Sequence, residues 1–283
     1  MPKSRVLFTN DLMHRWIREG RGQGEGSNYK PWLRVQNFPS LGVVHRIKGM
    51  KHGRIHHLFS NLERNCFYQY EWPLSVIDMR EQFALLPRDE TIEIAREMGV
   101  RHPTDPRTKC PIVMTTDLFL SIRQAMATTY QPITVKYMKD LRKQRVLEKL
   151  EIERRYWAAT PRNLKLRIFT EEQVSEAMIR NIQWLHPYYW PSDLYPLTEQ
   201  ELKKISSLLT YLLLNEDLPL RTVAQRSDRI LLLESGTCLA VLRHLLANRY
   251  WEIDIRSRIL TNQPLTLLTS PSDVLCGEKE VAA

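Results

Sequence analysis

Residues 114–136 read MTTDLFLSIRQAMATTYQPITVK, and this stretch decides the fold of the first part of the chain. It contains two apolar runs at hairpin distance, and apolar runs of this length are typical of strands. Side chains at positions i and i+2 of a strand share a face, so Thr134 and Lys136 point the same way. If Asp117 lies on the neighbouring strand, an acid, a hydroxyl and a lysine converge. Such a cluster would hold Mg²⁺ and hydrolyse a phosphodiester.

Residues 1–169 are expected to form one mixed α/β domain around this hairpin. The apolar periodicity predicts helices over 60–72, 89–98 and 146–157, and strands or extended segments over 75–80, 82–86, 112–122, 130–138 and 164–169. The order of helix, strands, helix and strand favours a sheet covered by helices.

Residues 170–283 are expected to form a second, mainly helical domain. Thr198 begins its most periodic helix and is followed three residues later by Glu201, which is the pattern of a capping box. Further helices are predicted over 170–185, 220–226 and 236–248, followed by strands over 250–256 and 264–268. Helices followed by a two-stranded wing are typical of a winged-helix-like domain.

The net charge of +9 is distributed unevenly along the chain. Residues 1–169 contain 30 Lys+Arg and 17 Asp+Glu, which gives +13, whereas residues 170–283 contain 11 and 15, which gives −4. A basic domain binds polyanions by releasing counterions from phosphates. The first part is therefore the expected double-stranded DNA binder, and the second part is better suited to docking another protein.

Cysteine usage and hydropathy indicate a cytoplasmic protein with no membrane partner. The four cysteines are widely spaced and form no CxxC motif, which favours free thiols in a reducing compartment. No apolar run reaches the roughly 18 residues that a membrane span needs. The first ten residues lack the apolar core of a signal peptide.

The acids each allow a structural and a functional interpretation. Ser60 and Glu63 form a capping-box pattern, in which the glutamate serves its own helix, but Glu63 could instead present a carboxylate to a metal. Asp117 lies in an apolar strand, where a carboxylate is costly unless it is paired, hydrogen-bonded or bound to metal. Glu153 lies on the helix after the lysine strand, where surface pairing competes with a role as an additional acid of the site.

Basic residues on both sides of these acids are candidates for binding a DNA backbone. They are Arg18, Arg21, Lys48, Arg54, His56, Lys139 and Arg142. The glycine-rich segment over 20–26 fails as a dinucleotide fingerprint because no strand precedes it, and we interpret it as a flexible loop that approaches phosphates. The irregular spacing of the histidines over 45–57 argues against zinc.

Several phrases of the sequence resemble the TnsA endonuclease family of bacterial heteromeric transposases. The phrases are EGRGQG over 19–24, RIHHL over 54–58 with SxLE over 60–63, DMREQFxLLP over 78–87, TD at 116–117, VK at 135–136 and LEKLEIERRYW over 147–157. They cover most of residues 18–169. In residues 170–283, the phrase that best resembles the family is NIxWL over 181–185.

The resemblance implies a restriction-endonuclease-like catalytic domain and a second domain that engages a TnsC-type AAA+ ATPase. It implies that the chain cuts the 5′ strands at transposon ends, while a TnsB-type DDE transposase cuts and joins the 3′ ends. The family's metal-binding acids fall on Glu63 and Asp117 and its lysine falls on Lys136. The family often has glutamine where this chain has Thr134, and the Val135 carbonyl would also serve the metal. The implied cofactor is Mg²⁺, as one or two ions, with Mn²⁺ as a substitute.

Two other functions stay open on the sequence alone. A stand-alone restriction-type nuclease would cut a fixed site unaided. A catalytically degenerate DNA-binding adaptor would recruit the regulatory ATPase without cutting, and Thr134 is the feature in its favour whereas Glu63, Asp117 and Lys136 are against it.

Overall fold

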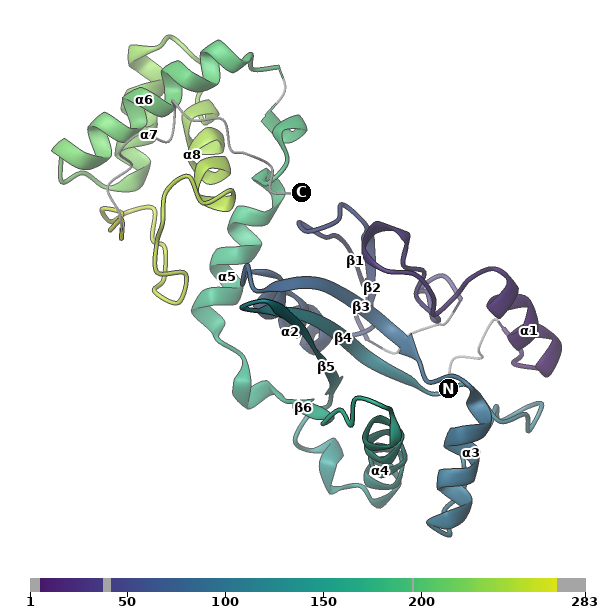
Figure 1. The fold of residues 1–283 in the computed structure, drawn as a ribbon. Helices are drawn as coiled ribbons and strands as arrows, with labels where there is room; N and C mark the ends of the chain where they lie inside the picture. Colours follow the sequence, from purple (N-terminus) through teal and green to yellow (C-terminus); the bar gives the residue numbers. More distant parts are fainter. Residues whose placement is uncertain (1–5, 38–41, 195, 269–283) are drawn as a thin grey trace. The chain divides into compact units, whose positions relative to one another are not determined.

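A four-stranded sheet organises the first of two units into which the chain divides, Met1–Val174 and Ser175–Ala283 (Figure 1). The computed structural model describes residues 6–37, 42–194 and 196–268. The strand order is β3 (Val76–Ala84), β4 (Thr115–Gln124), β5 (Ala127–Val135) and β6 (Arg167–Phe169). The first three strands are antiparallel, and β6 runs parallel to β5. The predicted hairpin is therefore confirmed as β4–β5, and the two extended segments expected over 75–86 form the single strand β3.

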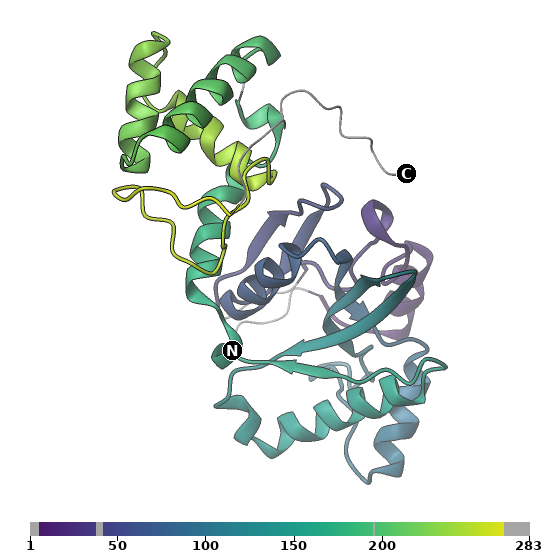
Figure 2. The ribbon, with the colours of Figure 1, turned by 60° about the vertical axis from the view of Figure 1, so that its left-hand side comes forward.

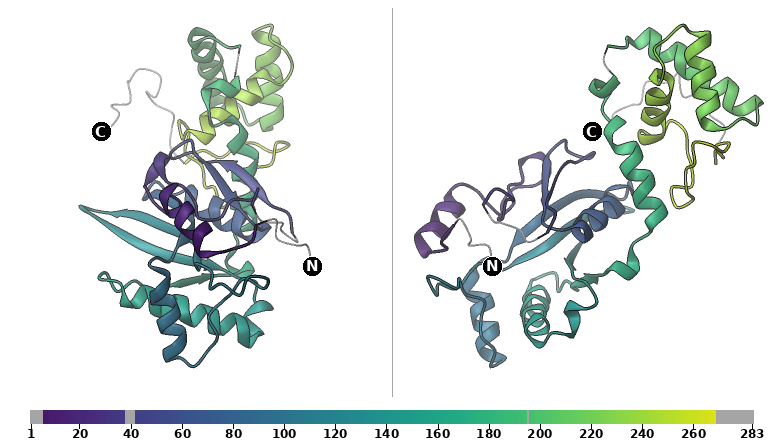
Figure 3. Two further views of the ribbon diagram at one scale, coloured as in Figure 1. Left: turned by 90° about the vertical axis from the view of Figure 1, so that its right-hand side faces the viewer. Right: turned by 180° about the vertical axis from the view of Figure 1, so that it is seen from behind.

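Helices cover both faces of this sheet, because each face carries apolar side chains that must be removed from water. Figure 2 shows α2 (Asn61–Glu71) on one face and α4 (Gln144–Ala159) on the other. The helix α3 (Arg88–Glu97) lies beside α4, as Figure 3 shows. On the α4 side, Phe119 of β4 stacks on Trp157 with ring centroids 5.0 Å apart.

A smaller hairpin and an N-terminal helix complete the first unit. The strands β1 (His45–Lys48) and β2 (Ile55–Leu58) pair antiparallel, and β2 leads directly into α2. The helix α1 (Asn10–Arg18) buries Trp16 against Trp32, with ring centroids 5.2 Å apart. Short 3₁₀ turns η1 (Gly26–Asn28), η2 (Asp140–Arg142) and η3 (Glu171–Gln173) connect these elements.

The second unit is helical. It contains α5 (Glu176–Leu185), η4 (His186–Tyr188), η5 (Pro191–Leu194), α6 (Glu199–Asn215), α7 (Leu220–Ile230) and α8 (Thr237–Ala247). The predicted capping box at Thr198 and Glu201 is confirmed. Within the residues that the structure describes, no helix combines the length and apolarity that a membrane crossing requires. Cys66, Cys110 and Cys238 are free, and Cys276 lies outside the described residues.

The prediction of two wing strands over 250–256 and 264–268 is wrong. Residues 250–268 form turns and irregular chain without a strand. Where the first of these segments ends, the buried side chain of Asn181 on α5 binds the backbone: its amide donates to the carbonyls of Ile255 and Ser257 at 2.9 and 2.7 Å and accepts from the amide of Ile259 at 3.0 Å. A side chain thus satisfies the backbone of the turn over 255–259, and a backbone hydrogen bond from Leu268 N to the Glu252 carbonyl at 2.8 Å joins the two segments without a strand ladder.

Candidate active site

Asp117 lies where strands β4 and β5 separate. Leu118 and Ile133 form the last backbone pair of the two strands, and β5 then continues in register with β6. Beyond that pair, the amide of Val135 donates to Asp117 Oδ2 at 2.7 Å. A side-chain carboxylate thus replaces the backbone partner that Val135 has lost, and the separation of the strands leaves room for the carboxylate.

Thr134 and Lys136 converge on the same carboxylate oxygen. The Thr134 hydroxyl donates to Asp117 Oδ2 at 3.1 Å, and Lys136 Nζ donates to it at 2.9 Å and to the Val135 carbonyl at 2.9 Å. Although burial lowers the pKa of Lys136, the Asp117 carboxylate outweighs burial and leaves this pKa raised. The predicted convergence of acid, hydroxyl and lysine is confirmed, and the chemical role of each group stays a prediction.

Glu63 forms the helix cap that its position predicted, and its role toward a metal stays a prediction. Its amide donates to Ser60 Oγ at 3.1 Å, and its carboxylate accepts from Ser60 Oγ at 3.1 Å and from the amide of Phe59 at 2.9 Å. The cap of α2 is therefore formed. Burial, followed by the charge of Asp117, raises the pKa of Glu63 to about 7. The capping glutamate is thus also a neighbour of Asp117.

Glu153 reaches the same region from α4 instead of pairing on the surface. Its side chain is buried and accepts a hydrogen bond from Thr116 Oγ1 at 2.7 Å. Burial, followed by the charge of Asp117, raises the pKa of Glu153 to about 8. Sequence reasoning missed Thr116 and Trp157, which hold this glutamate, because a threonine in a strand and a tryptophan in a helix carry no local signal of a polar site.

Oxygen ligands for a hard divalent cation are present, but they are few. Within the described ranges, no three His, Cys, Asp or Glu side chains form a metal-binding cluster. The three hydrogen bonds that Asp117 accepts from described residues converge on Oδ2, which leaves Oδ1 available to a cation. Burial contributes most to the raised pKa of Glu63, and the charge of Asp117 adds to it; a cation between the two carboxylates would relieve this repulsion. Two carboxylates and the Val135 carbonyl fit an ion that retains several waters, as Mg²⁺ does.

Two of the basic residues proposed to bind DNA, Arg21 and His56, are buried in the protein, and the side chain of a third, Arg54, is only 8% exposed. Arg54 and His56 hydrogen-bond Glu81 at 2.8 and 2.9 Å, inside a polar network that joins β2 to β3. Arg21 packs on the Trp16 ring at 4.3 Å and bonds Glu19. We therefore remove Arg21, Arg54 and His56 from the set of phosphate contacts. Arg18, Lys48, Lys139 and Arg142 are exposed.

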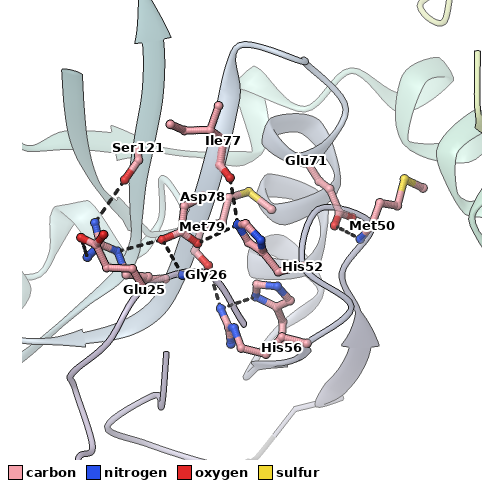
Figure 4. Close-up of polar contacts among 12 residues, drawn as sticks. Glu25, Gly26, Met50, His52, His56, Glu71, Ile77, Asp78, Met79 and Ser121 are labelled. Carbon is pink, nitrogen blue, oxygen red and sulfur yellow. Dashed lines mark hydrogen bonds and ion pairs between the residues drawn. The ribbon is translucent and has the colours of Figure 1, made fainter. Parts of the chain in front are cut away.

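The glycine-rich segment is packed and not a free loop. Gly22 has a positive φ of 72°, and a Cβ there would lie 2.7 Å from the Cβ of Ala84 on β3. Glu25 pairs with Arg80 of β3 at 3.2 Å, and the amide of Gly26 donates to Asp78 at 3.2 Å (Figure 4). The glycines allow this segment to lie against the sheet. The interpretation as a flexible phosphate loop is wrong.

Comparison with known proteins yields matches across both units. Residues 74–171 match the family described as TnsA-like endonuclease N terminal, and residues 173–255 match the family described as TnsA endonuclease C terminal. Over 270 residues, the chain is 36% identical to the transposon Tn7 transposition protein TnsA of Escherichia coli, and the match covers 95% of each protein.

Proposed function

The chain belongs to the TnsA family of transposase endonucleases, and from this membership we propose that it hydrolyses the 5′, non-transferred strands at transposon ends. The observation that supports a retained activity is the convergence of Asp117 and Lys136, with Glu63 beside them, where β4 and β5 separate. A sheet with helices on both faces and acids at a strand opening fits a restriction-endonuclease-like catalytic domain. A degenerate adaptor would have no need of this arrangement.

Each group of the site has a distinct proposed task. Glu63, Asp117 and the Val135 carbonyl would bind one or two Mg²⁺ ions, which would supply stabilisation of the charge on the reacting phosphate. Lys136 orients the attacking water or neutralises developing charge, since its ammonium lies 2.9 Å from Asp117. Thr134 supports Asp117 through its hydroxyl and is not a metal ligand in this proposal, because it is 1% exposed and its proton is directed at Asp117.

DNA would be held by exposed cations that do not read bases. Arg18, Lys48, Lys139 and Arg142 are the exposed members of the candidate set, and phosphate contacts position a duplex without specifying its sequence. We expect the double variant K139A/R142A to weaken duplex binding equally for unrelated sequences. It should reduce the slope of log K against log salt by about 2, or roughly one for each lost contact. Fluorescence anisotropy across a salt series measures this slope, and an unchanged slope would remove both residues from the interface.

The second unit is proposed to dock partner proteins, including the TnsC-type ATPase, and not to read a DNA groove. The helix α8 occupies the place of a recognition helix in the expected order, but its two basic side chains serve the fold. Arg243 Nε donates to the Trp184 carbonyl at 2.8 Å, and its guanidinium lies 3.8 Å from the Tyr188 ring centroid. His244 Nδ1 bonds the Tyr188 carbonyl at 2.8 Å. These groups are therefore unavailable for base contacts.

The decisive test of this function is strand-specific nicking of a labelled cognate transposon end. We expect 5′-strand nicks when the chain is combined with TnsB-type and TnsC-type partners and Mg²⁺ or Mn²⁺, and none with EDTA. The isolated chain should cut weakly or not at all, because the TnsB-type subunit delivers the DNA. Efficient cutting of a fixed site by the chain alone would favour the stand-alone nuclease. Unchanged 5′ nicking in EDTA would exclude a metal-dependent site.

A further inference from the structure

A chain of hydrogen bonds leads from the aromatic core of the first unit to the candidate active site. It begins at Trp157 of α4, which is 3% exposed and stacked on Phe119. Trp157 also packs against Phe83 with ring centroids 5.6 Å apart and meets Tyr156 edge to face at 5.4 Å. Rings on several sides fix the orientation of the indole, so its N–H has one direction. That N–H donates to Thr116 Oγ1 at 2.8 Å.

Thr116 transmits this orientation to Glu153. An indole N–H can only donate, so the Thr116 oxygen must be the acceptor of that bond. The single hydroxyl proton of Thr116 is then directed at Glu153 Oε1, 2.7 Å away. Thr116 is 0% exposed, so water does not compete for the hydroxyl. The Trp157 indole thereby fixes the orientation of the Thr116 hydroxyl, and this hydroxyl fixes one carboxylate oxygen of Glu153.

Glu153 in turn contacts the group that orients Asp117. The single hydroxyl proton of Thr134 is donated to Asp117 Oδ2, 3.1 Å away, so in its hydrogen bond with the Glu153 carboxyl the Thr134 oxygen is the acceptor. Three elements are joined in this way, since Trp157 and Glu153 lie on α4, Thr116 and Asp117 on β4, and Thr134 on β5. Within the described residues, neither the Thr116 hydroxyl nor the Trp157 indole hydrogen-bonds Asp117 or Lys136, so the hydrogen-bonded route from them to Asp117 leads through Glu153.

We propose that Trp157 and Thr116 are positioning residues, which fix Glu153 and, through Thr134, the Asp117 carboxylate in the geometry that metal binding requires. The inference rests on the proposed metal-dependent function. Groups that orient metal ligands through hydrogen bonds commonly change metal affinity or activity by about 10- to 100-fold when removed. A ligand strand that separates from its neighbour, as β5 does here, has a particular need of such support.

The test uses the full-length protein and four variants, Thr116→Val, Thr116→Ser, Trp157→Phe and the Val/Phe double variant. Mn²⁺ affinity is measured by isothermal titration calorimetry, and the Mg²⁺ dependence of 5′ nicking is measured with the partners present. We expect Thr116→Val and Trp157→Phe each to weaken Mn²⁺ binding about 10-fold or more. Thr116→Ser, which keeps the hydroxyl, should stay within about 3-fold of wild type. The double variant should be no worse than Thr116→Val, because the indole acts only through that hydroxyl.

Trp16→Phe is the matched control for loss of a buried indole. Trp16 is 2% exposed in the same unit but packs against Trp32, away from this chain of bonds. The Trp16→Phe substitution should lower the melting temperature and leave the Mn²⁺ affinity unchanged. Wild-type affinity in Thr116→Val and Trp157→Phe, or losses that add in the double variant, would overturn the proposal while leaving the nuclease assignment intact. A wild-type protein that neither binds Mn²⁺ nor nicks DNA would instead overturn the proposed function itself, and this inference with it.

Discussion

Replacing Asp117 with asparagine should abolish 5′-strand nicking and leave 3′-strand nicking by the TnsB-type partner intact. Asparagine keeps the shape and an oxygen that can accept from the Val135 amide, so the opening between β4 and β5 should persist. It removes the charge that pairs with Lys136 at 2.9 Å and that would bind the cation. Loss of a preorganised electrostatic group of this kind costs roughly 1,000-fold in rate. Labelled transposon ends, resolved strand by strand with all partners and Mg²⁺, measure both cuts in one reaction.

The matched control is Asp89→Asn. Asp89 lies in the first turn of α3 with its side chain 88% exposed, so the same chemical change there should leave both cuts at the wild-type rate. Equal melting temperatures would show that the two variants are folded. Persistent 5′ nicking by Asp117→Asn would mean that Asp117 is not in the catalytic centre, and the chain would then be better described as an adaptor that recruits the ATPase.

The part of this site that follows from short-range pattern was predictable from the sequence. The alternation of strand side chains places Thr134 and Lys136 together, and the hairpin brings Asp117 beside them, as the hydrogen bonds show. The capping-box pattern likewise predicted the local bonds of Glu63. Both signals act within a few residues, or across one hairpin, where geometry leaves few alternatives.

The contacts that depend on distant partners were not predictable. Arg54 and His56 look like phosphate ligands in the sequence, but Glu81 binds them across the fold. The segment over 250–256 does alternate between buried and exposed residues as a strand would, so its pattern was real. Among the described residues it forms no strand ladder: Asn181 binds the Ile255 carbonyl, and a backbone bond from Leu268 N to the Glu252 carbonyl joins it to the segment over 264–268. The periodicity of a sequence indicates which side chains are buried, but it does not indicate which groups accept the backbone hydrogen bonds.

The largest effect on stability is expected from Glu81→Gln. Glu81 is 0% exposed on β3 and accepts from Arg54 Nη1 at 2.8 Å, His56 Nδ1 at 2.9 Å and the amide of His57 at 3.2 Å. Glutamine has nearly the same shape but no charge, which leaves the buried guanidinium of Arg54 without its counterion. Breaking a buried pair by removing one partner costs about 3–5 kcal/mol, so at least about 3 kcal/mol should be lost from the free energy of unfolding. Urea denaturation at pH 7 measures the loss.

The pH dependence of the stability lost in Glu81→Gln distinguishes the effect of the missing charge from that of a packing defect. Burial alone would raise the pKa of Glu81, but His56 and Arg54 together hold this pKa well below its usual range. An unfolded glutamate titrates near about 4.3, so below that pH the unfolded chain binds a proton that the folded protein does not. The difference in free energy of unfolding between wild type and Glu81→Gln should be complete above about pH 5 and should shrink as the pH falls below about 4.3. Glu151→Gln, which breaks surface pairs with Arg154 and Arg155, should cost less than about 1 kcal/mol at any pH. A Glu81→Gln deficit that stays constant from pH 7 to pH 3 would show that shape, and not the buried charge, accounts for the destabilisation.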